Sequence, residues 1–371
     1  MAKDPPPFAQ PEYWDQRFTK NPSAFDWLLP ANCLDGAIVE ALEHATSPSN
    51  PRPRLLHIGC GTSILSLHLR SHVDDPRQVH NTDFSRVAVE LGARWERDVF
   101  EADATTAHEA SEAVRRESKE SGALNQDGAS PPELVKAPTG EEENGRKGGA
   151  EPATDHDHDD HRHPPRMQWS TLDLLSLPSI AALASREGRR YDIIVDKSTC
   201  DAISCGDDVP VPLPHPLQTS SSSTNSSSSS SSPSPSPSSS LSSSSSSPSP
   251  SPSASTTVNI HPLHILALHL ASLVPPGGRW LALSYSGQRF PFFEPFPARA
   301  DEGRLDAELL EKGFVHPGRL WRLERKEMVE AEEEGENGGG GGGLVHRPKT
   351  AHWVYVMVRS EVEVKLAGRG V

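Results

Sequence analysis

The sequence is poor in cysteine and in long apolar runs, and both shortages narrow the class of protein. Its 371 residues include four cysteines, which are spaced neither as zinc ligands nor as a disulfide framework. A reducing compartment is therefore expected, the cytoplasm first and the nucleus as the alternative. No apolar run reaches the ~18 residues of a membrane-spanning helix, so no membrane partner is expected. The start of the chain also lacks the apolar core of a signal peptide.

The sequence also lacks a basic region. It carries 36 Lys and Arg against 51 Asp and Glu, a net charge of −15. Most of this excess is local, because residues 101–165 hold 16 acidic against 7 basic residues and residues 330–336 hold five Glu. A general nucleic-acid-binding protein would show a basic stripe. No nucleic-acid partner is therefore expected, whereas a protein substrate stays compatible with this charge pattern.

Much of the chain has too little apolar character to build a core. Low hydrophobicity cannot offset the entropy of ordering such segments. Three inserts are predicted to be disordered: an acidic one at 100–165, a Ser/Pro one at 209–257 and a Glu/Gly one at 330–346. One domain of about 200–250 residues should remain. Its expected pieces are 1–99 (an amino-terminal cap and the first half), 166–208, 258–329 and 347–371 (a final strand and tail).

The most informative stretch joins a buried strand to a glycine turn and a helix. The apolar run Leu55–Ile58 predicts a strand, and Gly59 and Gly61 follow it directly. Thr62 or Ser63 could then cap the next helix. Glycines let the backbone approach a ligand closely, and such a turn forms the ligand cradle of open α/β sheets.

The same order of elements repeats along the chain. Strands are predicted at 78–83, 167–171 and 191–196; the first and third end in an acid, Asp83 and Asp196, and Asp173 lies just beyond the second. A further strand at 279–285 follows an apolar helix, and two late strands at 319–325 and 352–359 suit an antiparallel pair. We therefore expect a Rossmann-like α/β fold, with a seven-stranded, mostly parallel sheet, an antiparallel carboxy-terminal hairpin and helices on both faces.

These residues resemble the class I S-adenosylmethionine-dependent methyltransferases. The resemblance rests on the order of glycine turn, strand-end acids, Pro-Gly-Gly and terminal hairpin. Three blocks are similar to the branch that methylates lysines of elongation factor 1-alpha or of citrate synthase: Tyr13–Phe18 with Phe25–Trp27, Ile58–Ser63, and Asp196–Ile203. The resemblance implies S-adenosylmethionine as cofactor and a protein lysine as the methyl acceptor.

The resemblance also implies roles for single residues. Asp83 would bind the ribose, since two acceptor oxygens suit a vicinal diol. Asp173 would hold the adenine, and Trp14 with Arg17 would cap the cofactor carboxylate. Asp196, beside the transferred methyl group, and Lys197 form the implied catalytic pair. The full cofactor-binding set is Trp14, Arg17, Gly59, Cys60, Gly61, Asp83, Phe84, Asp173, Leu174 and Asp196.

Some residues depart from the family pattern, and they leave alternatives open. His57 stands two residues before the first glycine, where many of these enzymes carry an acid. We expect it to be a hydrogen-bonded core histidine rather than a catalytic residue. Ser198 and Cys200 replace Gly and Leu. The alternatives to a protein-lysine methyltransferase are a small-molecule methyltransferase and an inactive cofactor-binding scaffold. No metal site is expected, because the His/Asp tract at 155–163 reads as solvated, and the oligomeric state stays open.

Overall fold

The structure is a computed structural model, which describes residues 6–100, 165–188, 190–219, 256–293, 305, 307–330 and 351–366. The chain divides into two units, one formed by Met1–Gly92 with Met167–Val371 and the other by Ala93–Arg166. In the second unit the structure describes 93–100, which are helical, and 165–166. Everything below concerns the first unit.

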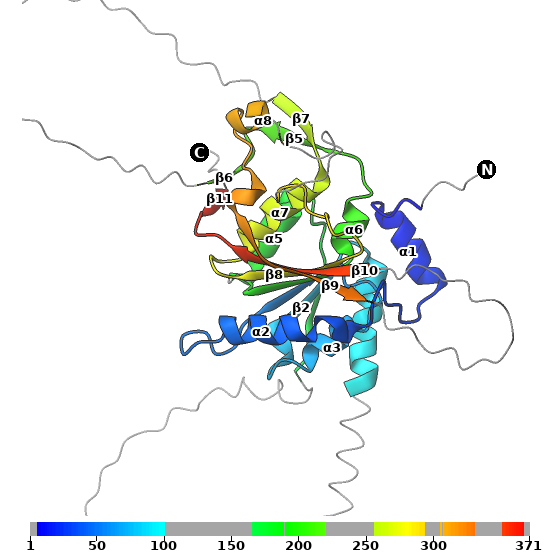
Figure 1. Cartoon of the computed structure of the whole chain (residues 1–371). Helices are drawn as coiled ribbons and strands as arrows, with labels where there is room; N and C mark the ends of the chain where they lie inside the picture. The colour runs from blue at the N-terminus through cyan, green and yellow to red at the C-terminus, as the bar shows by residue number, and fades with distance from the viewer. Residues whose placement is uncertain are drawn as a thin grey trace, which may run out of the picture. The chain divides into compact units, whose positions relative to one another are not determined.

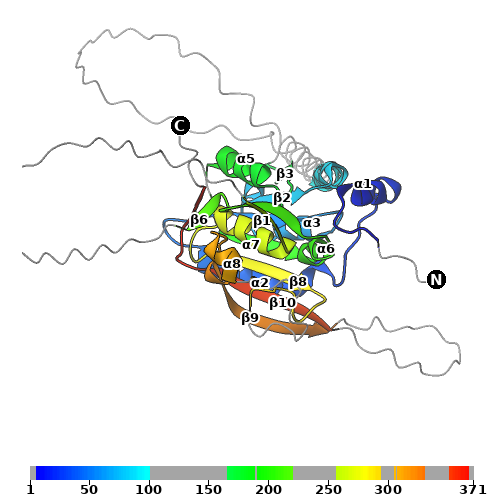
Figure 2. The same ribbon diagram turned by 90° about the horizontal axis from the view of Figure 1, so that it is seen from above.

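A seven-stranded sheet lies at the centre of this unit (Figures 1 and 2). Its strand order is β3-β2-β1-β4-β8-β10-β9. The strands span β1 (Leu55–Ile58), β2 (Val79–Asp83), β3 (Gln168–Thr171), β4 (Ile193–Lys197), β8 (Arg279–Ser284), β9 (Trp321–Glu330) and β10 (Ala351–Arg359). Strands β1, β2, β3, β4 and β8 pair in parallel, whereas β10 runs antiparallel to both β8 and β9. The predicted fold class is confirmed, including the antiparallel late pair.

Helices cover both faces of the sheet, as Figure 1 shows with the sheet seen edge-on. On one face lie α2 (Asp35–Ala45) and α3 (Leu65–Arg70), and on the other lie α5 (Leu177–Glu187), α6 (Thr199–Ile203) and α7 (Pro262–Leu273). Each face has its own apolar cluster, one with Ile38 and Leu69 and the other with Ile180 and Leu266. Because β1 and β4 pack on both sides, every residue of these strands is buried, as is typical of a covered parallel sheet.

The helix boundaries follow from local chemistry. Ser176 accepts a hydrogen bond from the Ser179 backbone and begins α5, and Gly188, in a left-handed conformation, ends it. Helix α7 is buried almost throughout, so its sequence is apolar on all sides. Residues 86–92 of this unit are helical too, and it also contains α1 (Pro11–Lys20) and α8 (Ala307–Glu311), with short 3₁₀ turns at Ala31–Leu34, Pro76–Gln78 and Pro317–Arg319. None of the helices in the described ranges has the length and apolar character to cross a bilayer.

The structure corrects the expected edges of two inserts. The predicted Ser/Pro insert, 209–257, overlaps three strands: β5 (Val209–Leu213), β6 (Leu217–Thr219) and the start of β7 (Thr256–Ile260). Strand β5 pairs with β7, and β6 pairs with the late strand β11 (Val364–Leu366). The predicted Glu/Gly insert, 330–346, begins inside β9. The rest of these two segments, and 101–164 of the acidic insert, lie outside the described residues.

Candidate functional site

A cavity of about 530 Å³ opens where the parallel strands end. The segments that follow β1, β2, β3, β4 and β8 all contribute to its wall. The chain builds β1 to β3 toward one edge of the sheet and then crosses over to β4 on the other side of β1. Open α/β sheets bind ligands at such a reversal, outside the carboxyl ends of the strands. The topology therefore marks this cavity as the candidate site.

The glycine turn after β1 forms the floor of the cavity. Gly59 has a φ of +57° and Gly61 a φ of +49°, a region that side chains disfavour. A Cβ on Gly59 would lie 2.1 Å from the Thr199 Oγ1, so there is no room for one. Thr199 in turn donates a hydrogen bond of 2.9 Å from its hydroxyl to the Ile58 carbonyl. The turn that follows β4 thus packs directly against the glycine turn.

Asp83, at the end of β2, holds the same turn from the other side. Its carboxylate accepts hydrogen bonds of 2.8 Å from the backbone N–H of Gly61 and of Ser85. The side chain lines the cavity although the residue is almost fully buried. Burial raises the pKa of Asp83 to about 6, while the two backbone hydrogen bonds act in the opposite direction. The cavity wall therefore carries a hydrogen-bond acceptor, the Asp83 carboxylate, whose charge changes with pH around 6.

Aromatic side chains from the amino-terminal segment cover the cavity. Trp14 and Phe18 of α1 stack with ring centroids 5.6 Å apart, and Phe8 and Trp27 meet edge to face at 5.5 Å. All four rings line the cavity, together with Phe25. Both views place α1 at the end of the sheet where α6 lies (Figures 1 and 2). The aromatic block that carried the family resemblance thus forms the lid of the site.

The segment after β3 contributes a carboxylate between apolar side chains. Asp173 is exposed, and one of its oxygens accepts a hydrogen bond of 2.9 Å from the Leu175 backbone. Leu172 and Leu174 on either side are buried, and all of them line the cavity. The Asp173 carboxylate and the two leucine side chains therefore give this part of the wall one polar and two apolar groups.

Most of the predicted site residues meet at this cavity. Those at its wall are Trp14, Gly59, Cys60, Gly61, Asp83, Phe84, Asp173, Leu174 and Lys197. Cys60 is buried, and burial raises the pKa of its thiol, so the side chain acts in packing rather than as a nucleophile. Two predicted residues, Arg17 and Asp196, are absent from the wall.

Asp196 caps a helix. The residue is completely buried, and one carboxylate oxygen accepts hydrogen bonds from the backbone N–H of Thr199, at 2.8 Å, and of Cys200, at 3.3 Å. Both donors lie in the first turn of α6. Burial, and then the nearby Asp201 charge, raise the pKa of Asp196 to about 7. Its place beside the transferred methyl group and its catalytic role both stay predictions.

Arg17 is not among the residues that line the cavity. Its guanidinium lies over the Phe25 ring, 4.4 Å from the centroid. A cation over an aromatic face is a stabilising contact. Arg17 therefore supports the aromatic lid through Phe25, and direct contact with a cofactor carboxylate stays a prediction.

Lys197 ties the lid to the sheet. Its Nζ lies 3.1 Å from an Asp26 carboxylate oxygen and donates a hydrogen bond of 2.7 Å to the Trp27 carbonyl. The side chain is 2% exposed, and burial lowers the pKa of its amine, although Asp26 counteracts this. Because a buried ion pair is costly to break, we assign Lys197 a positioning role for the Asp26–Trp27 segment.

Asp201 and Tyr285 are site residues that the sequence reasoning passed over. The Asp201 carboxylate pairs with Arg289 at 2.7 Å and accepts hydrogen bonds from the Ser284 hydroxyl and the Tyr285 backbone. Tyr285 is half exposed at the cavity rim, with the Arg289 guanidinium over its ring. Asp201 and Thr199 both lie in the Asp196–Ile203 block of the family resemblance, so this block was the sequence feature that could have identified them.

His57 is a core histidine, as its buried strand position indicated. Its Nδ1 lies 3.1 Å from the Ser66 hydroxyl and 3.0 Å from the Asn81 amide oxygen. Burial lowers the pKa of His57 to about 4, so the ring is neutral at physiological pH. The ring is not part of the cavity wall. Its replacement of an acid at this position leaves Asp83 as the buried carboxylate nearest the glycine turn.

The chain shows limited similarity to known proteins. No protein-family model matches the chain. The methyltransferase srdJ of Neurospora crassa is 27% identical over 204 residues, and the match covers 55% of this chain and 57% of that protein. A solved S-adenosylmethionine-dependent methyltransferase from Anabaena variabilis is 10% identical, with a TM-score of 0.40. That match covers 94% of this chain and 93% of the Anabaena chain. A structure from work on echinomycin biosynthesis is 13% identical with a TM-score of 0.40, covering 95% and 94%.

The curated relative supports the predicted resemblance to methyltransferases, and the strand order is that of a Rossmann-like α/β fold. The chain spans little more than half the length of that relative. This similarity does not bear on the narrower group of lysine methyltransferases.

The first prediction concerns the glycine turn. Gly59→Ala should lower the free energy of unfolding more than Gly188→Ala. Both glycines have a φ near +58°, but a Cβ at Gly188 meets nothing within 4 Å. The left-handed backbone alone costs about 1–2 kcal/mol, and overpacking against Thr199 should add about 1–3 kcal/mol. Chemical denaturation followed by circular dichroism measures both, and equal losses would contradict the packing described here.

The second prediction concerns Asp196 and pH. Its raised pKa means that the folded protein holds this proton more tightly than the unfolded chain does. The resulting stability is fully present below the unfolded value of 3.8 and is lost as the pH rises through about 7. Relative to Asp196→Asn, the wild type should lose up to about 1.4 kcal/mol per pH unit within this window. Denaturation at several pH values tests this, with exposed Asp207→Asn as control; parallel wild-type and Asp196→Asn profiles would refute it.

Proposed function

We propose that this protein is an S-adenosylmethionine-dependent methyltransferase. The observation that carries the proposal is the cavity at the β1/β4 crossover, where the Gly59–Gly61 turn and the Asp83 carboxylate share one wall. The similarity to a curated methyltransferase supports it independently. So does the resemblance of the three sequence blocks, two of which form the lid and the turn after β4.

The described residues fit this cofactor. Gly59 and Gly61 both line the cavity and add no side chain to its wall, which suits a ligand that lies close to the backbone. Asp83 offers carboxylate oxygens for the ribose hydroxyls. Asp173 lies between Leu172 and Leu174, a setting that suits an adenine with its polar edge outward. When bound, the cofactor supplies an activated methyl group for an in-line displacement.

The protein's own contribution is positioning and the exclusion of water. Phe8, Trp14, Phe18 and Trp27 form a wall that shields the reacting atoms from solvent. Lys197 and Asp26 hold Trp27 in place through one ion pair and one backbone hydrogen bond. Orienting two reactants in this way can contribute as much as about 7–11 kcal/mol to the barrier reduction.

For the methyl acceptor we propose a lysine side chain of a protein. The resemblance of Asp196–Ile203 to the lysine-methylating branch supports this choice. Tyr285, half exposed at the rim, and the Trp27 ring offer aromatic faces that favour a cationic amine and its methylated product. A small-molecule acceptor is the second candidate, because an apolar cavity of about 530 Å³ is within the range of small-ligand pockets.

The third prediction is that cofactor binding depends on Asp83. Asp83→Ala should weaken S-adenosylmethionine and S-adenosylhomocysteine binding at least tenfold in isothermal titration, because the ribose loses its acceptor. Wild-type affinity should fall as the pH drops through about 6, since protonation removes the carboxylate that receives the hydroxyl donors. The limit is about tenfold per pH unit.

Asp207→Asn, an exposed carboxylate outside the cavity wall, is the matched control and should bind as the wild type does. Circular dichroism shows whether Asp83→Ala is folded, and the wild-type pH profile needs no substitution at all. Normal binding by folded Asp83→Ala, or a flat wild-type profile, would remove Asp83 from the cofactor site.

The fourth prediction separates the possible acceptors. Cell lysate incubated with the protein and methyl-labelled cofactor should show label in a protein band, and acid hydrolysis should return it as methyl-lysine. Label in the small-molecule fraction would favour the second candidate. Cofactor binding without any methyl transfer would instead support the third alternative, an inactive cofactor-binding scaffold. The folded Asp83→Ala variant is the negative control and should leave both the protein and the small-molecule fraction unlabelled.

A further inference from the structure

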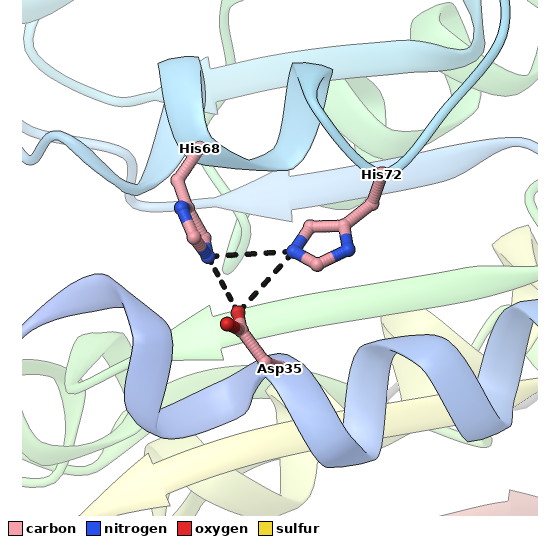
Figure 3. Close-up of side chains that lie close together, drawn as sticks. All are labelled: Asp35, His68 and His72. Atoms are coloured by element: carbon pink, nitrogen blue, oxygen red, sulfur yellow. Dashed lines mark hydrogen bonds and ion pairs between the residues drawn. The ribbon is translucent and has the colours of Figure 1, made fainter.

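Two histidines and an aspartate meet on the face of the sheet that carries α2 and α3. Asp35 is the first residue of α2, His68 lies in α3, and His72 lies two residues beyond its end. Figure 3 shows the two imidazole rings pointing at the same carboxylate from across the gap between the helices. None of these residues lines the cavity described above. The proposed methyltransferase function makes no use of them.

Two of the three distances between the facing atoms are those of a ligand set. The Nε2 atoms of His68 and His72 lie 3.3 Å apart, and the His72 Nε2 lies 3.2 Å from the Asp35 Oδ1. Ligands at 2.0–2.1 Å from a tetrahedral ion are separated by about 3.3 Å, and octahedral ligands by about 2.9 Å. The third pair, His68 Nε2 and Asp35 Oδ1, is closer at 2.5 Å, a hydrogen bond that an entering ion would replace.

Burial and chemistry also suit an ion. The side chains are 26%, 16% and 41% exposed for His68, His72 and Asp35, so water and metal can reach the site while the rings stay held by the helices. Two neutral imidazoles and one carboxylate are borderline ligands that favour zinc over magnesium or calcium. Among the described residues this is the group whose facing ligand atoms all lie within 4.8 Å of one another.

We infer that Asp35, His68 and His72 form a zinc site, with water as the fourth ligand. The ion would fasten the start of α2 to the end of α3. Helix α3 follows the glycine turn directly, and the 3₁₀ turn Ala31–Leu34 joins the lid segment to α2. A zinc ion here would therefore hold together the two helices that follow the lid segment and the glycine turn, outside the cavity wall.

Zinc titration of the full-length, chelator-treated protein tests the inference. The His/Asp tract at 155–163 could bind metal too, so the parent for all variants carries Ala at His156, His158, His161 and His163. This parent should bind one Zn²⁺ per chain. Asp35→Asn, His68→Ala and His72→Ala should each weaken binding at least tenfold. His44→Ala, an exposed histidine on α2, is the matched control and should leave the affinity unchanged.

A second measurement keeps the test decisive if a variant fails to fold. X-ray absorption at the zinc edge of the loaded parent should show four nitrogen and oxygen ligands, two of them imidazole. Zinc should also raise the melting temperature of this parent, and Asp35→Asn should abolish the rise. Binding that vanishes with the tract histidines, a sulfur ligand, or an affinity indifferent to all three variants would overturn the site.

Discussion

The packing of Thr199 against Gly59 is the contact on which the candidate site depends. The threonine occupies the space where a side chain on Gly59 would lie, and its hydroxyl bonds to the end of β1. Asp83 holds the other end of the same turn through the Gly61 backbone. Three strands that are distant in sequence thus position one short loop. Its left-handed backbone costs little because Gly59 and Gly61 lack a Cβ, and the surrounding contacts fix its position from both sides.

Burial sets the electrostatics around that loop. Asp83 and Asp196 both end parallel strands, and both have a raised pKa because little water reaches them. Their hydrogen bonds give them different places in the structure. Asp83 shares its oxygens between two loops and still lines the cavity, whereas Asp196 gives one oxygen to the first turn of α6. Two strand-end acids that look equivalent in sequence therefore act differently.

The lid shows a similar separation of roles. Trp14, Trp27 and Lys197 line the cavity, whereas Arg17 does not. Arg17 contacts the Phe25 ring, and Lys197 contacts Asp26 and the Trp27 carbonyl, so both also support the lid. The family resemblance implied a cofactor contact for Arg17 and a catalytic role for Lys197, and both stay predictions. The supporting contact of Lys197 joins segments that are far apart in the sequence.

Local patterns in the sequence determined the large sheet, its antiparallel late pair and the glycine turn, because a strand, a cap or a left-handed turn depends on adjacent residues. They also placed most of the cavity wall, since parallel strands bring their carboxyl ends to one edge. Only the tertiary structure decided the capping role of Asp196, the small strands around 209–219 and 256–260, and the meeting of Asp35 with His68 and His72. Each of these depends on contacts between segments that no local pattern connects.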